Sequence, residues 1–224
     1  MLDKKDVVSV IIPTYNRQDM LFEALASVLT QVYVNIEVLV IDNMSDDHTL
    51  ARLAQLSDPR VKVLTEARRG AAAARNAGIR AATGEFLAFL DSDDLWLPTK
   101  LAVQVERIKT LNSPSLIFAE YREFLTDQPD NVSRGNTSKM SLSLITMLIR
   151  KADFDHVGLF DHNLQTGEFL EWYARALRLG MKPSIIDQVL SLRRIHAGNS
   201  ASNARGARDY INACRAIIAN RSKP

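Results

Sequence analysis

Three carboxylates crowd into four residues at Asp91-Ser92-Asp93-Asp94, directly after an apolar run. Like charges this close repel one another, and a fold rarely places them at the end of a buried strand without a compensating cation. Mg²⁺ and Mn²⁺ prefer oxygen ligands and often share their shell with phosphate oxygens, so we interpret Asp93 as a direct metal ligand. Asp91 would bind a ribose or orient a metal-bound water, with Asp94 supporting both. The alternative is an acidic turn that caps a helix beginning at Pro98.

Two further polar clusters follow apolar runs in the same way. They are Pro13-Thr14-Tyr15-Asn16-Arg17 and Asp42-Asn43-Met44-Ser45-Asp46-Asp47. In open parallel sheets, ligands bind beyond the carboxyl ends of the strands. We therefore expect these two clusters and residues 91–94 to meet at one edge of a sheet.

The elements that must position these clusters alternate between short apolar runs and amphipathic stretches, as a parallel sheet with crossover helices requires. Apolar, β-branched runs predict strands at residues 7–12, 36–41, 61–64, 85–90, 116–121, 144–149 and 188–195. Amphipathic or Ala-rich runs predict helices at residues 17–31, 71–82, 98–111, 169–179 and 209–219, and another that carries Leu50, Leu53 and Leu56. Asn16 is the expected N-cap of the first helix, and Ser45 or Asp46 that of the second.

Length and composition predict one domain with a real core, because 46% of the 224 residues are apolar. The net charge of +2 is too balanced to indicate a nucleic-acid partner. Cys214 is the only cysteine, and no apolar run is long enough to span a bilayer. We therefore expect a cytoplasmic α/β protein, with peripheral membrane contact and a homo-oligomer both compatible with the sequence. Polar residues 126–139 and 198–206 are candidate lids.

Four longer stretches carry a wider match: VSVIIPTYNR, VLVIDNMSDDHT, GAAAARNAGIRAATGEFLAFLDSDDLWLPTKL and VGLFDHNLQTGEFLEWYARA. They resemble family 2 glycosyltransferases of the GT-A fold, over most of the first 175 residues. The resemblance implies a Rossmann-like, mostly parallel sheet flanked by helices. Residues 1–111 would form the nucleotide-sugar-binding half, and residues 112–224 a small acceptor-side elaboration with a C-terminal helix.

The resemblance also implies which residues contact the nucleotide-sugar. They are Pro13, Thr14, Tyr15, Arg17, Asp42, Arg69, Gly70, Arg75, Asp91 and Ser92. Asp42 would accept the ring N–H of uracil or thymine and reject bases that present acceptors, because an unpaired buried acceptor costs roughly 1–3 kcal/mol. Arg75 would bind a phosphate or an acid of residues 91–94. As alternatives, Asp42 would cap a turn and Arg75 would be a solvated helix charge.

Sugar transfer with inversion needs a base that removes a proton from the acceptor hydroxyl, and a carboxylate is the usual solution. Glu168 and Glu171 lie three apart on a predicted helix, so both can face one cleft, and the sequence leaves the choice between them open. Many relatives carry Glu-Asp where this chain has Glu168-Phe169. The common base position is therefore apolar here. The alternative for either glutamate is a solvated helix face.

Three residues near the end of the last predicted strand complete the site that the resemblance implies. His196 would be a second metal ligand, or else a structural histidine, and Arg193 with Arg194 would neutralise the leaving diphosphate. We expect Trp172 and Tyr173 to be core residues rather than sugar-stacking ones.

The resulting prediction is a Mn²⁺- or Mg²⁺-dependent inverting glycosyltransferase with a UDP- or dTDP-sugar donor. Its acceptor is left open among carbohydrate, lipid-linked, peptide and small-molecule classes. The first alternative is a catalytically impaired nucleotide-sugar-binding or regulatory module of the same fold, for which Phe169 and Met44 are the only support. A sugar-1-phosphate nucleotidyltransferase ranks last, because no Gly-rich basic signature follows the first strand.

Overall fold

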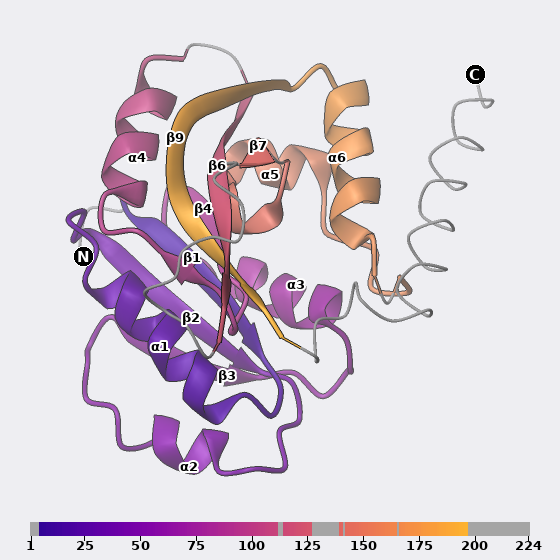
Figure 1. Cartoon of the computed structure of the whole chain (residues 1–224). Coiled ribbons are helices and arrows are strands. Elements are labelled where there is room, and N and C mark those ends of the chain that lie inside the picture. The colour runs from indigo at the N-terminus through magenta and orange to yellow at the C-terminus, as the bar shows by residue number, and fades with distance from the viewer. Residues whose placement is uncertain (1–4, 112–113, 127–138, 141, 165, 197–224) are drawn as a thin grey trace.

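One sheet of nine strands forms the centre of the described chain, with helices packed against it (Figure 1). The computed structural model describes residues 5–111, 114–126, 139–140, 142–164 and 166–196. The strands are β1 (Val8–Thr14), β2 (Ile36–Asp42), β3 (Val61–Thr65), β4 (Phe86–Phe89), β5 (Leu95–Trp96), β6 (Ser115–Leu125), β7 (Lys139–Met140), β8 (Leu148–Arg150) and β9 (Lys182–Ile195). The helices are α1 (Gln18–Leu29), α2 (Thr49–Leu53), α3 (Ala71–Ala81), α4 (Lys100–Lys109), the 3₁₀ turn η1 (Leu144–Thr146), α5 (Lys151–Val157) and α6 (Glu168–Arg178).

The strand order is β3-β2-β1-β4-β8-β6-β9-β5, and β7 pairs with β6 outside this row. The strands of the first half are parallel, since β1 pairs with β2 and β4, and β2 with β3, in this sense. The second half is mixed, because β8 runs antiparallel to both β4 and β6 while β9 is parallel to β6. The α/β class is confirmed, and the carboxyl ends of β1, β2 and β4 meet at one edge.

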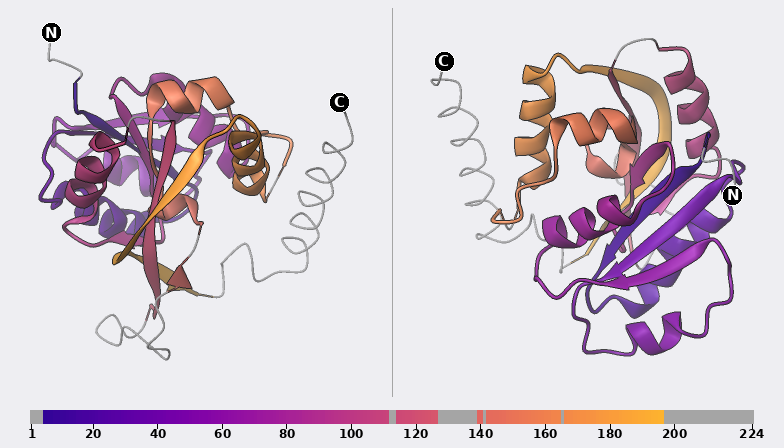
Figure 2. Two further views of the ribbon diagram at one scale, coloured as in Figure 1. Left: turned by 90° about the horizontal axis from the view of Figure 1, so that it is seen from above. Right: turned by 180° about the vertical axis from the view of Figure 1, so that it is seen from behind.

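Two apolar cores lie on opposite faces of the sheet. Ile11 packs into the core under α3, α5 and α6, whereas Val10 and Ile12 pack into the core under α1 and α4. The view from behind in Figure 2 brings α3, α5 and α6 in front of the sheet. Burial on both faces is the physical reason that β1, β2 and β4 read as nearly continuous apolar runs rather than alternating ones.

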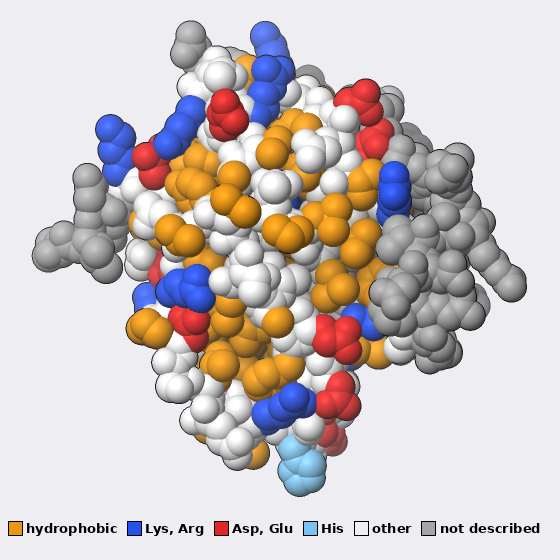
Figure 3. Space-filling view, turned by 60° about the vertical axis from the view of Figure 1, so that its left-hand side comes forward, with side chains coloured by type: hydrophobic (Ala, Val, Ile, Leu, Met, Phe, Trp, Pro, Cys, Tyr) orange, Lys and Arg blue, Asp and Glu red, His pale blue; other side chains and the backbone are white. Residues whose placement is uncertain are grey.

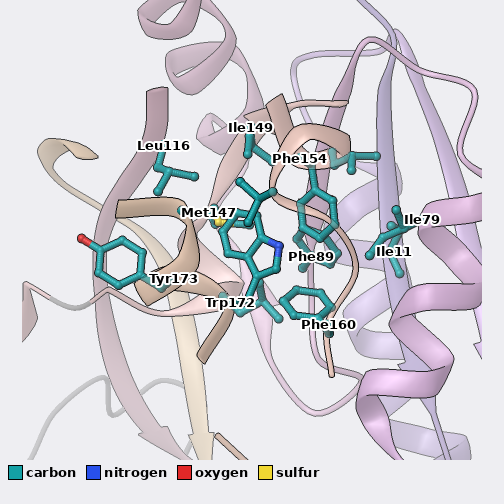
Figure 4. Packing of buried hydrophobic residues seen from close by; sticks show 14 of the residues in the cluster. Ile11, Ile79, Phe89, Leu116, Met147, Ile149, Phe154, Phe160, Trp172 and Tyr173 are labelled. Carbon is teal, nitrogen blue, oxygen red and sulfur yellow. The ribbon is translucent and has the colours of Figure 1, made fainter. Parts of the chain in front are cut away.

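An aromatic cluster anchors α6 to the sheet (Figure 4). Trp172 is fully buried, stacks on Phe154 with ring centroids 4.7 Å apart, and donates from Nε1 to the Gly158 carbonyl at 2.7 Å. Tyr173 meets Phe118 edge-on with ring centroids 5.9 Å apart. The Phe169 ring contacts the rings of both Trp172 and Tyr173. The prediction that Trp172 and Tyr173 are core residues is confirmed, and their burial fixes the direction in which the first turn of α6 points.

The expected helix caps are wrong, because the polar residues after β1 and β2 bind each other instead. Asn16 has a left-handed backbone with φ of 50°, and its Nδ2 donates to Asp46 Oδ1 at 2.6 Å. The Asp46 N–H donates back to Asn16 Oδ1 at 2.9 Å, and the Asn16 N–H donates to Ser45 Oγ at 3.0 Å. Helices α1 and α2 therefore have Arg17 and His48 at their N-cap positions. The two strand-end loops are joined directly.

Several element boundaries also differ from the sequence prediction. Residues 144–149 form η1 followed by β8 rather than one strand, and α4 begins at Lys100 rather than at Pro98, whose carbonyl accepts from the Val32 N–H at 2.9 Å. Helix α5 and strand β5 were not expected, and β9 begins at Lys182 instead of near residue 188. The predicted helix at 209–219, the loop at 198–206 and most of the loop at 126–139 lie outside the described residues.

A buried carboxylate, Glu37, ties β2 to the turn before β4. Its Oε1 accepts from Ser9 Oγ at 2.6 Å and from the Thr83 N–H at 2.6 Å, and its Oε2 accepts from Lys62 Nζ at 3.0 Å. Burial alone would raise the pKa of Glu37, but the hydrogen bonds from Ser9, Thr83 and Lys62 outweigh it and lower the pKa from 4.5 to about 2. The folded state therefore favours the ionised form.

We expect Glu37→Gln to lower the free energy of unfolding at pH 7 by about 2–3 kcal/mol, the range that such a pKa shift supports. Because the folded pKa lies below the unfolded one, this contribution is complete above about pH 4.5 and disappears as the pH falls to about 2. Urea unfolding at pH 7 and pH 3 measures it, with Glu106→Gln on the exposed face of α4 as control. A deficit of equal size at both pH values would contradict the assignment.

Several charged side chains on the described surface form ion pairs with a residue of opposite charge. Arg52 contacts Asp19 at 2.8 Å, and Lys109 contacts Asp6 at 2.7 Å. Figure 3 shows the same mixing on one face, where Lys and Arg side chains lie beside Asp and Glu.

Candidate functional site

The site begins with two neighbouring polar side chains at the carboxyl ends of β1 and β2. Thr14 and Asp42 are register partners that are 3% and 1% exposed. Asp42 Oδ2 accepts from the Ser45 N–H at 3.1 Å, but Asp42 Oδ1 and Thr14 Oγ1 find no hydrogen-bond partner in the part of the chain that the structure describes. A buried unpaired acceptor is costly, and a hydrogen-bond donor on a ligand could satisfy this pair.

Beside this pair, Arg69 lies over the ring of Tyr15. The guanidinium carbon is 5.0 Å from the ring centroid, and Nη1 donates to the Tyr15 hydroxyl at 3.0 Å. Both residues are exposed, and Gly70 follows with φ of 120° as the N-cap of α3. An aromatic face and a guanidinium next to an orphaned carboxylate oxygen form a surface suited to a planar, polar ring.

Arg75 on α3 joins two acids that are far apart in sequence. Its Nη2 donates to Asp91 Oδ1 at 2.5 Å, and its Nη1 donates to Glu168 Oε1. Burial would lower the pKa of Arg75, but Asp91 and Glu168 outweigh it and raise the pKa, so the guanidinium stays charged. The interpretation that Arg75 binds an acid of residues 91–94 is therefore supported, and Glu168 belongs to the same ion-pair chain.

A second cluster of opposite charges surrounds Asp93. The His196 Nε2 lies 2.9 Å from Asp93 Oδ2, and Arg17 Nη1 lies 3.0 Å from the same imidazole nitrogen and 3.5 Å from the carboxylate. Charge compensation that was expected from a metal ion alone is thus supplied in part by Arg17 and Arg75. His196, which was predicted to be a second metal ligand or else a structural histidine, thus lies beside Asp93, and its binding of a metal stays a prediction.

Asp93 and His196 supply an oxygen and a nitrogen ligand that could together hold a divalent cation. In the structure the two atoms are in direct contact at 2.9 Å, with Arg17 Nη1 beside both. Within the described ranges, no group of three or more His, Cys, Asp or Glu side chains is arranged to hold a metal. Further ligands would therefore be phosphate oxygens and water, as is common for these ions.

Asp94 and Arg194 hold the acidic loop in place from the interior. Asp94 is 5% exposed and accepts the Arg194 N–H at 2.8 Å, while burial followed by repulsion from Asp91 and Asp93 raises its pKa. Arg194 Nε donates to the Asp93 carbonyl at 2.8 Å, and its Nη2 pairs with Glu23 of α1. The expectation that Arg194 neutralises a diphosphate is wrong, because its side chain is only 3% exposed and already engaged.

The two candidate bases have different surroundings. Glu171 pairs with Arg175 Nε at 2.8 Å, and Arg175 in turn donates to the Val157 and Leu159 carbonyls at 2.7 Å each. Glu171 therefore holds Arg175 in the position from which it stabilises the connection between α5 and α6. Glu168 instead lies in the ion-pair chain with Arg75. The structure brings Glu168 to the acidic loop and does not bring Glu171 there.

The remaining predicted donor residues line the same edge. Pro13 is the penultimate residue of β1, and Ser92 is 7% exposed within the acidic loop. Sequence reasoning missed two residues that shape the site, Asn43 and Glu23. The position of Asn43 after Asp42 was a usable signal, whereas Glu23 lies 171 residues from its partner Arg194 and gave none.

Comparisons with known proteins point to one family. A family model described as "Glycosyl transferase family 2" matches residues 9–158. The UDP-Glc:alpha-D-GlcNAc-diphosphoundecaprenol beta-1,3-glucosyltransferase WfgD of Escherichia coli is 42% identical over 116 residues, which are 51% of this chain and 46% of WfgD. WfaP of Escherichia coli, whose name gives the same activity, is 27% identical over 88% of this chain and 81% of its own length.

Solved structures share the fold. The S. aureus TarS fragment 1–349 in complex with UDP-GlcNAc has a TM-score of 0.77 at 24% identity, covering 95% of this chain and 65% of that one. The mannosyltransferase PcManGT from Pyrobaculum calidifontis, in complex with GDP-Man and Mn²⁺, has a TM-score of 0.74 at 24% identity, covering 97% of this chain and 65% of that one. This chain therefore spans about two thirds of these structures and about half of WfgD. In the described residues, no helix combines the length and apolar character needed to cross a membrane.

Proposed function

Because the chain belongs to glycosyl transferase family 2, we propose that it transfers a hexose from a UDP-sugar, with inversion, to a hydroxyl of a lipid-linked sugar. The arrangement of Glu168, Arg75 and Asp91 carries the proposal, because it places a carboxylate beside the acidic loop at the strand ends. WfgD and WfaP, both named for a UDP-Glc donor and a diphosphoundecaprenol-linked acceptor, support the donor and acceptor classes.

Thr14 and Asp42, at the ends of β1 and β2, would bind the base of the nucleotide-sugar. The uracil N3–H would donate to Asp42 Oδ1, an atom that otherwise has no partner among the described residues. Tyr15 and Arg69 would contact the base face, and Arg17 lies on the side where the diphosphate would approach Asp93. Cytosine presents an acceptor at the same ring position, so the pocket would discriminate against it.

In the transfer step, Glu168 would accept the proton of the attacking hydroxyl. The new glycosidic bond forms at the anomeric carbon as the bond to the diphosphate oxygen breaks, and UDP leaves. Arg75 fixes Glu168 through Oε1, while Glu168 Oε2 has no hydrogen bond to the residues that the structure describes. A divalent cation held by Asp93 and His196 would neutralise charge on the departing diphosphate.

The alternative of a catalytically impaired module rests on weak grounds. Phe169 replaces an acid, but its ring packs against Phe118 and Trp172, and the neighbouring Glu168 reaches the site. Met44 is 49% exposed, much as Tyr15 is at 40%, so its side chain does not fill the space that the base would occupy. Neither residue therefore argues against transfer.

Release of UDP from UDP-glucose in the presence of a lipid-linked GlcNAc diphosphate acceptor tests the proposal. We expect release that depends on the acceptor, stops with EDTA and returns with Mn²⁺ or Mg²⁺. Undiminished turnover in EDTA would refute the cation's role. Tight UDP-sugar binding without transfer to lipid-linked, carbohydrate, peptide or small-molecule acceptors would favour the impaired module instead.

A further inference from the structure

Asn43 makes three side-chain hydrogen bonds to one neighbouring loop. Its Nδ2 donates to the Glu66 carbonyl and to the Arg68 carbonyl, both at 2.7 Å. Its Oδ1 accepts from the Gly70 N–H, also at 2.7 Å. The residue is 7% exposed, so these three bonds lie away from bulk water and each loss would leave a buried group unpaired.

The Asn43 main chain is itself fixed to the sheet. Its N–H donates to the Thr14 carbonyl at 2.8 Å, and the Asp42 carbonyl accepts from the Glu66 N–H at 2.9 Å. The carboxamide therefore projects from a rigid strand end onto the segment between β3 and α3. Gly70 has φ of 120°, a conformation that side chains rarely adopt, and this turn directs its N–H back toward Asn43.

The loop held in this way carries one residue of the proposed donor site. Arg69 lies over Tyr15 immediately before the glycine at which α3 is capped. Arg69 is exposed and its own contacts are with Tyr15, so its placement depends on how the loop backbone is held. Asn43 is the side chain that holds this backbone at Glu66, Arg68 and Gly70.

We infer that Asn43 is a positioning residue for the nucleotide-sugar, acting through Arg69; the inference rests on the proposed function. The pattern requires an amide, because two carbonyls need donors and one N–H needs an acceptor. A carboxylate of the same shape satisfies only the N–H and sets negative charge against two carbonyl oxygens. Donor binding weakens as a result, while the groups at the reacting centre stay in place.

The test compares Asn43→Asp with Asn35→Asp, the same chemical change at an exposed asparagine whose Nδ2 donates to the Lys5 carbonyl at 3.3 Å. We expect Asn43→Asp to raise the donor KM and the Kd for UDP about tenfold. The kcat and the acceptor KM should change less than twofold, and Asn35→Asp should change nothing. Equal effects on donor and acceptor KM, or a donor effect below twofold, would overturn the inference.

Arg69→Ala provides a second measurement that does not disturb the buried loop bonds, because Arg69 is exposed. If Asn43 acts through Arg69, the single and double variants raise the donor KM and the Kd for UDP by similar factors. If the double variant instead raised the donor KM and the Kd by the product of the two single-variant factors, Asn43 would not act through Arg69. Calorimetry of UDP binding separates the two proposals. If the wild-type chain binds UDP but transfers no sugar, the proposed activity is refuted, and the role of Asn43 is still tested by the Kd for UDP. If the wild-type chain does not bind UDP, both proposals are refuted.

Discussion

Replacing Glu168 by glutamine is expected to reduce kcat by about 10²–10⁴-fold, the range for loss of a positioned general base. The amide keeps the size of the side chain and an oxygen for Arg75, but it cannot accept the proton of the attacking hydroxyl. Because the residues proposed to bind the uracil base are Asp42 and Tyr15, the Kd for UDP should change less than threefold. Steady-state transfer together with UDP calorimetry measures both quantities.

Glu171→Gln is the matched control, since it makes the same change three residues along the same helix. Glu171 supports Arg175 and the connection between α5 and α6, so we expect a slightly lower melting temperature and a kcat within threefold of wild type. A larger loss of kcat in Glu171→Gln than in Glu168→Gln would reverse the assignment. Equal, small losses in both would show that the base lies elsewhere.

Replacing Asp93 by asparagine is expected to lower kcat/KM by at least about 10²-fold and to abolish stimulation by Mn²⁺. The reason is that Asp93 is the carboxylate proposed to bind the cation, and a neutral amide binds such hard ions weakly. Mn²⁺ binding followed by calorimetry in the presence of UDP gives a readout that does not depend on turnover.

Asp187→Asn, on the exposed part of β9, removes the same charge at a distance from the acidic loop and should leave Mn²⁺ binding unchanged. Retention of Mn²⁺ binding in Asp93→Asn would show that another group holds the ion. Loss of binding in both variants would point to net charge rather than to a specific ligand.

The parts of the fold that could be predicted are those whose signal is local. Strands β1 and β2 are buried on both faces, so their apolar runs are continuous, and the strand-end rule then placed Thr14, Asp42 and Asp91 at one edge. Strand β5 has only two residues, and the first half of β9 is largely exposed and contains Pro183, so neither carries a periodic pattern. These elements are defined by their pairing partners rather than by their own sequence.

The choice between Glu168 and Glu171 shows where local reasoning ends. Spacing of three residues puts both on one helix face, and only tertiary contacts separate them. Arg75 comes from a helix 93 residues away from Glu168, and the carbonyls that orient Arg175 belong to the α5–α6 connection. The caps of α1 and α2 were missed for the same reason, because Asn16 satisfies its amide on Asp46 across two loops.

The contact between Asp93 and His196 joins the two halves of the chain. Asp93 follows β4 in the amino-terminal half, whereas His196 directly follows β9, which is built on β6 in the second half. A chimaera that kept residues 1–111 and took the rest from a relative would keep the residues proposed to bind the base. It would bind the cation as proposed only if the relative's last strand placed a histidine beside Asp93. Acceptor preference could therefore be exchanged only between relatives that preserve this contact.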